Sequence, residues 1–404
     1  MIDVMMIVPL LPYPVMDGDS VRHYNLIKRL ASECNIHLFA FAKEEHLDMG
    51  LKEMNKYCAA VHAIPNRKMP RSWWLRQHAK SILRGAPTYA SAHYRQQMIE
   101  TVTESLRKYR FDIIQVEHSF LAEYLKDAIK LQSSASTILT IHNIEAIRAY
   151  RVYKHQRWGK AKIIYAIDAL LFRRFEPWAI KLPDKCITVS EANKCQLEST
   201  TGNKDIIVIE NGVDTDINPV SINPDSKELL FIGGLSYHPN VDGAEYITNE
   251  ILPLIKEQIP DIQLNIVGKA PCPRVLVLDK VDNVSVYGDV PDVRPWYERS
   301  IMSVVPLRSG GGTRLKILES MGLGVPVVTT SIGCEGLDVT HEEHLLIADT
   351  PVEFAACVLK LIEDHNLRDR LIRNARQLVE RRYSWDAIAP QLLSVYKSLL
   401  NKSN

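Results

Sequence analysis

The sequence predicts an α/β protein with two doubly wound, Rossmann-like domains. Three observations support this: short apolar segments rich in β-branched residues recur along the chain, helical patterns separate them, and the chain has 404 residues. Apolar segments without strict alternation are typical of strands covered on both faces, and strand–helix alternation indicates parallel sheets. At roughly 100–200 residues per domain, the length predicts two domains.

Thirteen segments are predicted strands, which is more than one open sheet usually holds. They are Val4–Val8, Ile36–Phe41, Ala60–Ile64, Ile113–Val116, Thr137–Ile141, Lys185–Val189, Ile206–Ile209, Glu228–Ile232, Gln263–Val267, Val284–Tyr287, Met302–Val305, Val325–Thr329 and Leu345–Ile347. Helices are predicted between them, for example Ser20–Glu33, Gln96–Tyr109 and Pro351–His365.

Turn-forming residues cluster at 211–219, so we expect the domain boundary there. The predicted organisation is a first domain at 1–210, a second at 211–384 and a C-terminal helix at 385–404 that returns to the first. Ligands of open α/β sheets bind at the carboxyl ends of strands. Two such sheets facing each other predict a site in a cleft between them.

Charge and cysteine content exclude several classes of protein. The 49 Lys and Arg residues nearly balance 48 Asp and Glu, so the basic excess of a nucleic-acid-binding protein is absent. The seven scattered cysteines form no CxxC pair, which argues against a zinc site and predicts reduced thiols in the cytoplasm. The apolar N-terminus resembles a strand rather than a signal peptide, and no apolar run approaches the ~18 residues of a membrane span.

A glycine-rich segment at 304–322 is the most informative part of the sequence. A strand ends at Pro306, three glycines follow at 310–312, and Thr313 is the predicted N-cap of a helix that stops at Gly322. Arg314 and Lys316 then lie in the first turn, where the helix dipole disfavours cations. An anion bound by the glycine and helix amides would reverse that balance, and a diphosphate is the natural candidate. Solvated side chains on an ordinary helix are the alternative.

Glu319 favours the ligand-binding interpretation. It lies about 9 Å along the helix from Thr313, at 1.5 Å per residue. Carboxylates accept hydrogen bonds from ribose hydroxyls in dinucleotide folds, although a simple ion pair with Lys316 is the alternative. No G-x-G-x-x-G follows the first strand and no P-loop motif occurs, which argues against NAD and against a P-loop ATPase.

An ordered set of short motifs resembles glycosyltransferase family 4, retaining enzymes of the GT-B fold. The motifs are Pro12-Tyr-Pro, Gly18, Arg22, Asn25-Leu26, Thr140-Ile-His-Asn143, Thr188-Val-Ser-Glu191, Asn211-Gly-Val-Asp214, Phe231-Ile-Gly-Gly234, Ile266-Val-Gly-Lys269, Val286-Tyr-Gly-Asp-Val290, Arg314–Glu319, Gly324-Val-Pro-Val-Val-Thr329 and Glu335-Gly-Leu337. The resemblance covers essentially the whole chain. It implies transfer of a hexose-type sugar from a nucleotide-sugar to a glycan or lipid-linked acceptor, in surface-polysaccharide synthesis.

The resemblance also implies the donor-binding residues. They are Gly18, Gly234, Gly268, Lys269, Val290, Gly311, Gly312, Thr313, Leu315 and Glu319. Within this set, the Glu319 position binds the ribose hydroxyls in family members. Segments matching Gly268-Lys269 and Gly288–Val290 flank the base there, and loop amides meet the diphosphate.

Two departures from the family pattern concern the donor site. The family signature has two glutamates separated by seven residues, but Gly311 stands where the first is expected. The basic pair that many members carry after the first strand of the second domain is also missing from 233–240. We therefore expect Arg314 and Lys316 to supply the missing charge, with no metal required. UDP is the expected nucleotide, and GDP is the alternative.

The family often presents a histidine from the first domain to the donor sugar. His118, which follows a predicted strand, is the candidate catalytic residue together with Arg314 and Lys316. His142 and Glu117 are weaker candidates. The two D-x-D sequences, Asp17–Asp19 and Asp214–Asp216, mimic a metal-binding motif of another glycosyltransferase fold, but both fall in predicted turns.

Residues 66–84 carry six basic side chains, no acidic one, and the apolar residues Trp73, Trp74, Leu75, Ile82 and Leu83. Such a segment suits an anionic membrane surface, so peripheral contact with the inner face of the cell membrane is expected. An amphipathic surface helix or an acceptor-binding loop is the alternative. Two further functions stay open: a nucleotide-sugar epimerase or sugar-phosphate synthase of the same fold, and a nucleotide-sugar binder without turnover.

Overall fold

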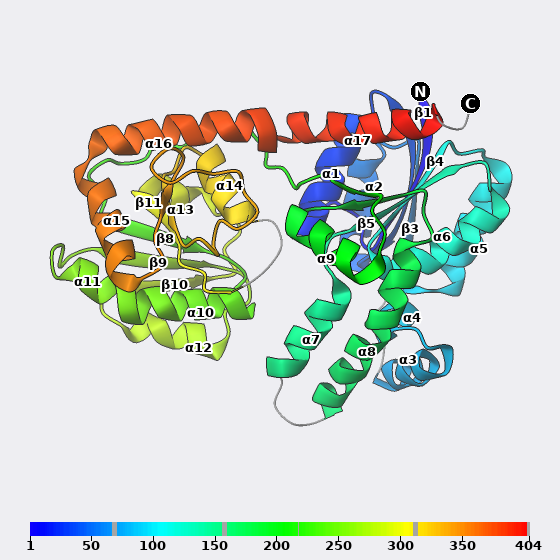
Figure 1. Ribbon diagram of the computed structural model, residues 1–404, viewed down its shortest axis with the longest axis horizontal. Helices are drawn as coiled ribbons and strands as arrows, with labels where there is room; N and C mark the ends of the chain where they lie inside the picture. Colours follow the sequence, from blue (N-terminus) through cyan, green and yellow to red (C-terminus); the bar gives the residue numbers. More distant parts are fainter. Residues whose placement is uncertain (67–70, 156–159, 217, 310–313, 402–404) are drawn as a thin grey trace. The chain divides into compact units, whose positions relative to one another are not determined.

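The computed structural model describes residues 1–66, 71–155, 160–216, 218–309 and 314–401, with backbone alone for 71–72, 74–75, 151, 155 and 160–161. The chain forms two compact units, which are described separately (Figure 1). Unit 1 comprises Met1–Glu210 together with Ile388–Asn404, and unit 2 comprises Asn211–Ala387. Unit 1 is therefore built from two separate stretches of chain.

Unit 1 contains a seven-stranded parallel sheet. Its strands, in spatial order, are β3 (Ala60–Pro65), β2 (Cys34–Ala42), β1 (Ile2–Val8), β4 (Ile113–Glu117), β5 (Ser136–Ile141), β6 (Lys185–Thr188) and β7 (Ile206–Val208). The order reverses between β1 and β4, which places the topological switch point of this sheet between them.

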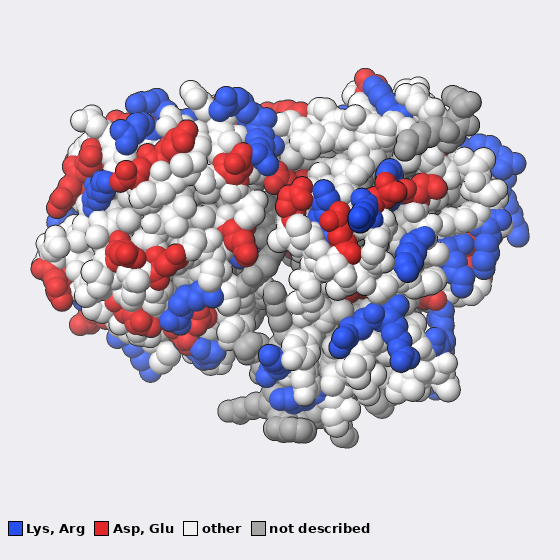
Figure 2. Space-filling view, in the orientation of Figure 1, with Lys and Arg blue, Asp and Glu red and all other residues white. Residues whose placement is uncertain are grey.

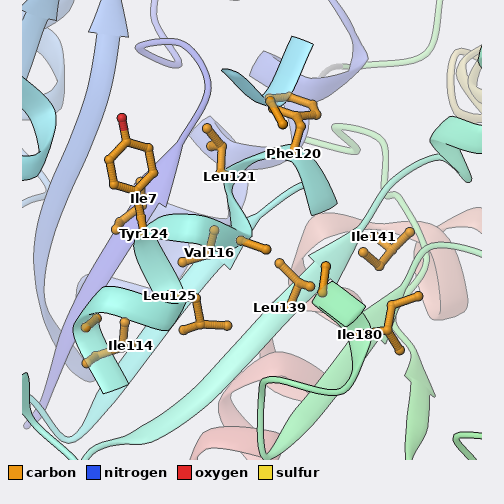
Figure 3. Close-up of a cluster of buried hydrophobic side chains, with 14 of the residues drawn as sticks. Ile7, Ile114, Val116, Phe120, Leu121, Tyr124, Leu125, Leu139, Ile141 and Ile180 are labelled. Carbon is orange, nitrogen blue, oxygen red and sulfur yellow. The ribbon is translucent and has the colours of Figure 1, made fainter. Parts of the chain in front are cut away.

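Helices cover the sheet of unit 1. They are α1 (Gly18–Leu30), α2 (Leu47–Met54), α3 (Arg71–Arg84), α4 (Thr88–His93), α5 (Gln96–Lys108), α6 (Ala122–Leu131), α7 (Glu145–His155), α8 (Lys160–Ile180), α9 (Glu191–Thr201) and α17 (Trp385–Leu400), whose residues from Ile388 belong to this unit. Figure 3 shows Val116 of β4 and Leu139 of β5 packed with Leu125 of α6 in the buried core. This core fixes the carboxyl ends of β4 and β5 next to each other.

Unit 2 contains a six-stranded parallel sheet with the same winding. Its strands, in spatial order, are β10 (Val284–Gly288), β9 (Gln263–Gly268), β8 (Glu228–Ile232), β11 (Met302–Val305), β12 (Val327–Thr329) and β13 (Leu346–Ile347). The switch point lies between β8 and β11. Ligand sites of open α/β sheets lie at such points, so each sheet has one expected position.

The helices of unit 2 pack on both faces of its sheet. They are α10 (His238–Tyr246), α11 (Leu252–Lys256), α12 (Pro273–Leu276), α13 (Arg294–Arg299), α14 (Leu315–Gly322), α15 (Pro351–Glu363) and α16 (His365–Leu378). One buried cluster joins the strands to α10, α11 and α15, and another joins them to α14 and α16. The start of α14 is thereby held at the end of β11.

The predicted doubly wound α/β fold is confirmed, and each predicted strand overlaps an observed one. Two helix boundaries were wrong. The first helix begins at Gly18 rather than Ser20, because Asp17 and Ser20 form a capping box. The glycine-rich segment leads to a helix whose N-cap is Arg314, so the prediction that Thr313 caps it was wrong.

Candidate functional site

In unit 2, Gly233 and Gly234 directly follow β8, one of the two strands that flank the switch point. A Cβ atom added to Gly268 at the end of β9 would lie 1.7 Å from the Gly233 carbonyl oxygen, so the two backbones approach too closely for any side chain. A Cβ on Gly234 would meet no atom of the described residues within 4 Å. The Gly234 backbone therefore borders open space at the ends of β8 and β9.

The beginning of α14 brings two cations to the same edge of the sheet. Arg314 is buried, and its Nη2 donates to the carbonyl oxygen of Ile332 at 3.1 Å. Lys316 is the second residue of the helix, and its Nζ donates to Asn240 Oδ1 at 2.7 Å. The Lys316 ammonium also lies 5.0 Å from the centre of the Phe231 ring, so the end of β8 and the start of α10 both position it.

Glu319 lies one turn further along α14, and its side chain is half-buried. Among the described residues, its carboxylate has no hydrogen bond or ion pair, so the predicted alternative of a Lys316–Glu319 pair is not formed. Burial raises the pKa of Glu319 to about 7, although Lys316 opposes the rise. Burial and the neighbouring Arg314 lower the pKa of Lys316 to about 7. Both groups are thus close to half-ionised at neutral pH.

The neighbouring strand ends hold three other predicted residues. Gly268 closes β9 and Lys269 follows it, with the Lys269 carbonyl accepting from the Leu235 amide at 2.8 Å. Asp289, which follows β10, accepts from the Ala270 amide at 2.9 Å and so links the two loops. Val290 is half-buried beside that link. Leu315 is the first residue of α14, whereas Gly311, Gly312 and Thr313 lie outside the described residues.

In unit 1, acidic and histidine side chains meet at the switch point. Asp19 comes from the first turn of α1, His118 follows β4 and His142 follows β5. His118 Nε2 lies 3.1 Å from Asp19 Oδ2, and His142 Nδ1 lies 3.2 Å from Asp19 Oδ1. The two imidazoles are stacked with centroids 4.2 Å apart. Both histidines are buried, but Asp19 is 43% exposed, so the cluster reaches solvent through this carboxylate.

Glu117 is buried behind these residues. Its Oε2 lies 2.6 Å from His142 Nε2 and 3.3 Å from His23 Nε2. Its Oε1 accepts hydrogen bonds from Thr140 Oγ1 and from Gln115 Nε2. These partners of the carboxylate come from α1, from strands β4 and β5, and from His142 directly after β5. A chain of contacts then runs from Glu117 through His142 and Asp19 to His118.

The surroundings of His142 and His118 shift the pKa values of the two imidazoles in opposite directions. Burial disfavours the charged form of His142, but hydrogen bonds to Asp19 and Glu117 outweigh it and raise its pKa to about 9. Burial and the adjacent His142 lower the pKa of His118 to about 4. Burial acts against the ionised carboxylates, yet the histidines hold the pKa values of Asp19 and Glu117 below their usual range. At neutral pH, His142 is therefore an imidazolium and His118 is neutral.

The backbone of His118 is strained. Its φ of 72° and ψ of 139° lie in a region that non-glycine residues rarely adopt. Its amide donates to the Thr140 carbonyl at 2.7 Å, which holds this conformation in place. Such strain is concentrated at functional sites. Gly18, the remaining predicted site residue of unit 1, is exposed at the first position of α1, one residue before Asp19.

Among the described residues of unit 1, two trios of side chains have the composition of a metal site. The ligand-type atoms of each trio lie within 4.8 Å of one another, and the trios are Asp19, His118 and His142, and His23, Glu117 and His142. The same atoms account for the contacts described above. The D-x-D sequences have other roles: Asp17 caps α1, and Asp214 Oδ1 accepts from the Asp216 amide at 3.0 Å.

Part of the predicted membrane segment forms α3. Leu83 is 87% exposed and Ile82 is exposed as well, whereas Trp73 is half-buried with the Arg95 guanidinium 5.5 Å from its ring. Trp73 is therefore a packed residue rather than a free anchor. The side chains of Trp74 and Leu75 lie outside the described part. Among the described residues, none of the helices has the length and apolar character needed to span a bilayer.

Several residues of these clusters escaped prediction. Asp19 was considered only as part of a D-x-D sequence, and His23, Gln115 and Asn240 were not considered. The signal for Asp19 was its place at the start of the helix that follows the first strand, because that helix begins at the edge of the sheet where the carboxyl ends of adjacent parallel strands meet. His23 carries a weaker signal, since it lies one helical turn after Asp19.

Comparisons with known proteins identify the family of this chain. The model of the family described as Glycosyltransferase Family 4 matches residues 16–217, and that of Glycosyl transferases group 1 matches residues 226–364. A Klebsiella pneumoniae protein, described as an uncharacterized 44.6 kDa protein in the cps region, is 23% identical over 92% of this chain and 94% of its own. A glycosyltransferase of Methanocaldococcus jannaschii is 26% identical over 71% of this chain and 75% of its own.

Solved structures show the same fold. Sucrose-phosphate synthase from Thermosynechococcus elongatus superposes with a TM-score of 0.69 at 18% identity, over 100% of both chains. Anabaena HepE, solved with UDP and glucose, gives a TM-score of 0.69 at 13% identity, over 98% of this chain and 100% of its own. These likenesses confirm the GT-B fold. Because one family model spans half of the chain, and the resemblance seen in the motifs is thereby confirmed, this protein belongs to glycosyltransferase family 4.

Proposed function

We propose that this protein is a retaining glycosyltransferase that moves a hexose-type sugar from a UDP-sugar to a glycan or lipid-linked acceptor in surface-polysaccharide synthesis. Membership of family 4 supports the transfer reaction. The Anabaena structure with UDP and glucose supports the choice of nucleotide, and the Klebsiella relative from a cps region supports the polysaccharide context. GDP is the alternative nucleotide.

One observation carries the donor assignment: the Glu319 carboxylate has no partner among the described residues and lies one turn from Lys316, on a helix that begins with Arg314 as its N-cap. Such a carboxylate can accept hydrogen bonds from the two hydroxyls of a ribose. Arg314 and Lys316 then neutralise the diphosphate at the start of α14, where the helix dipole also attracts anions. Gly234, whose backbone borders open space, lets a ligand approach the end of β8.

The chemistry follows from this charge distribution. The acceptor oxygen forms its bond to the anomeric carbon while the bond from that carbon to the diphosphate oxygen breaks. UDP leaves with the bonding electron pair and takes up the proton of the acceptor hydroxyl, on the face from which it departs. Arg314 and Lys316 stabilise the charge that develops on the leaving group, and no metal ion is needed for that purpose. We assign the contact with the reacting sugar to His118.

The ribose assignment is tested by calorimetric titration with UDP. Glu319→Gln should weaken UDP binding at least tenfold, because it removes charge-assisted hydrogen bonds worth about 1.5–3 kcal/mol. Glu363→Gln, an exposed carboxylate at the end of α15, is the matched control and should bind like the wild type. Wild-type affinity in Glu319→Gln would contradict the assignment, and hydrolysis of a UDP-sugar by the wild-type protein without acceptor would count against binding without turnover.

We also propose peripheral contact with an anionic membrane through residues 66–84. The exposed side chains of Ile82 and Leu83 at the end of α3 support it, together with the basic residues of the segment. Replacing Arg76 and Lys80 by Gln, and Leu83 by Ser, should reduce co-sedimentation with phosphatidylglycerol vesicles. The control changes Lys280 and Arg370 of unit 2 to Gln. Equal sedimentation of both variants would refute this contact.

A further inference from the structure

A cavity of about 700 Å³ in unit 1 lies among α7, α8 and α9. Its walls are formed by the rows of side chains that α7 and α8 turn towards it, at spacings of three and four residues. The lining residues include Ile147, Tyr150, Ala166, Ala169, Leu170 and Glu176. The volume is within the range of about 300–1,000 Å³ that ligand pockets occupy.

The walls are mostly apolar, and small residues keep them apart. Ala146 of α7 faces the cavity, as do Ala166 and Ala169 of α8, where larger side chains would fill the space. Protein interiors are otherwise close-packed, so an open volume of this size lined by alanine, isoleucine and leucine is a place for an apolar ligand. Leu170 lines it and is 63% exposed, so the cavity is accessible from solvent.

The carboxylate of Glu176, at the inner wall of the cavity, already accepts hydrogen bonds from protein groups. Glu176 accepts from the amides of Glu145 and Ala146 at 2.6 and 3.0 Å, and burial raises its pKa to about 7. Ser119 Oγ donates to the same carboxylate at 3.3 Å, and Ser119 is the neighbour of the strained His118. The inner wall of the cavity is therefore continuous with the histidine cluster, and it offers a ligand little unmet polarity.

The outer surface of the same two helices is basic. Among the basic side chains of 145–180 that the structure describes, Lys154, Arg173 and Arg174 are exposed, whereas the acidic side chains of the segment, Glu145, Asp168 and Glu176, are buried. Figure 2 shows Lys and Arg side chains, with few acidic ones, over the surface where α7 and α8 lie. An apolar cavity beneath a basic surface is complementary to a molecule with a hydrocarbon chain and an anionic head.

We propose that this cavity binds the hydrocarbon chain of a lipid-linked acceptor whose phosphate group lies against the basic surface of α7 and α8. The proposal rests on the glycosyltransferase function proposed above. Of the two classes of acceptor named there, a glycan and a lipid-linked acceptor, it selects the second. A cavity next to His118 would hold the acceptor by its chain, so the sugar-accepting end would be presented from unit 1.

The test measures binding of farnesyl phosphate to the full-length protein by calorimetry, with inorganic phosphate as the headgroup probe. Leu170→Glu, inside the cavity, should weaken farnesyl phosphate binding at least tenfold. Ile163→Glu is the matched control, because Ile163 is 57% exposed on the same helix but does not line the cavity. The control should change the affinity less than twofold, and Ala166→Trp should act like Leu170→Glu by filling the space.

Three results would overturn the proposal: equal affinities of the two glutamate variants, no effect of Ala166→Trp, or inorganic phosphate binding as tightly as farnesyl phosphate. Equal losses in both glutamate variants would indicate a general membrane-binding surface. UDP titration of the same preparations separates this proposal from the proposed function. Failure of UDP binding would refute the donor site while farnesyl phosphate binding still reports on the cavity.

Discussion

Lys316 and Glu319 lie on one turn of α14, and their surroundings displace both pKa values towards 7, from opposite directions. Partial burial disfavours the charged form of each group, and neither neutralises the other by an ion pair. A ribose would supply the partner that the Glu319 carboxylate lacks among the described residues, and a diphosphate would give the Lys316 ammonium, which bonds a neutral amide oxygen, an anionic partner. The unliganded protein thus holds two groups whose charged forms a nucleotide would stabilise.

This arrangement predicts a bell-shaped pH dependence of UDP affinity with a maximum near pH 7. Above pH 7, Lys316 loses its proton and the attraction for the diphosphate falls. Below pH 7, Glu319 gains a proton and loses the negative charge that strengthens its hydrogen bonds from ribose. Lys316→Met should flatten the alkaline limb and Glu319→Gln the acidic limb, as measured by calorimetry between pH 5.5 and 9.

The acidic limb needs a separate control because the terminal phosphate of UDP itself titrates near pH 6. A residual decline below pH 6 in Glu319→Gln belongs to the nucleotide. A wild-type affinity that is constant between pH 6.5 and 8.5 would show that neither group titrates in the binding step.

At the scale of elements, α17 completes the polar network of the first sheet. The Tyr396 hydroxyl on this helix donates to Gln115 Oε1, and Gln115 in turn donates to Glu117, which holds His142. Tyr396 and Gln115 are both fully buried. The C-terminal helix therefore orients a carboxylate at the switch point through one intervening amide, and Tyr396 is a positioning residue.

Tyr396→Phe should lower the pKa of His142 from about 9, because Glu117 is held less firmly against the imidazole. The lost hydrogen bond should also cost about 1 kcal/mol of unfolding free energy. NMR titration of the histidine resonances measures the first effect, which a purely structural role would not produce. The control is Lys397→Ala. Lys397 lies on the same helix as Tyr396, and the change removes only its exposed ion pair with Glu33. An unchanged His142 pKa would contradict the positioning role.

The strands could be predicted because a buried parallel strand needs a short, continuous apolar segment, and this pattern is local. The start of α14 was misplaced by one residue, since Thr313 is a better N-cap by residue type than Arg314. At the site, Glu319, Lys316 and His118 could be singled out from motif order and from position after strands. The contact between Tyr396 and Gln115 spans 281 residues, and no local pattern signals it.

At the scale of the whole molecule, the first unit depends on a segment that is remote in sequence. Ile388, Leu392, Tyr396 and Leu399 are almost completely buried, and all belong to unit 1. Burying each such side chain is worth about 1.5–3 kcal/mol, so together they contribute on the order of the entire stability of a typical domain. Unit 2 retains its own cores without them.

Ending the chain after Ala387 should therefore destabilise unit 1 while unit 2 stays folded. Hydrogen exchange followed by mass spectrometry should show loss of protection in β1, β4 and β5, with protection retained in β8, β9 and β11. A chain ending at Leu400 is the control and should exchange like the full sequence. Native protection of β4 in the shorter chain would show that the helix is dispensable.

The discontinuity of unit 1 has a consequence for biosynthesis. After Glu210 is made, the ribosome must add all of 211–387 before the stretch from Ile388 can join the first sheet. At 5–20 residues per second, this takes roughly 10 to 35 s. During that interval Gln115 lacks its tyrosine partner, and the side of the sheet that α17 covers is bare. The nascent first unit thus stays incomplete until synthesis reaches the last helix.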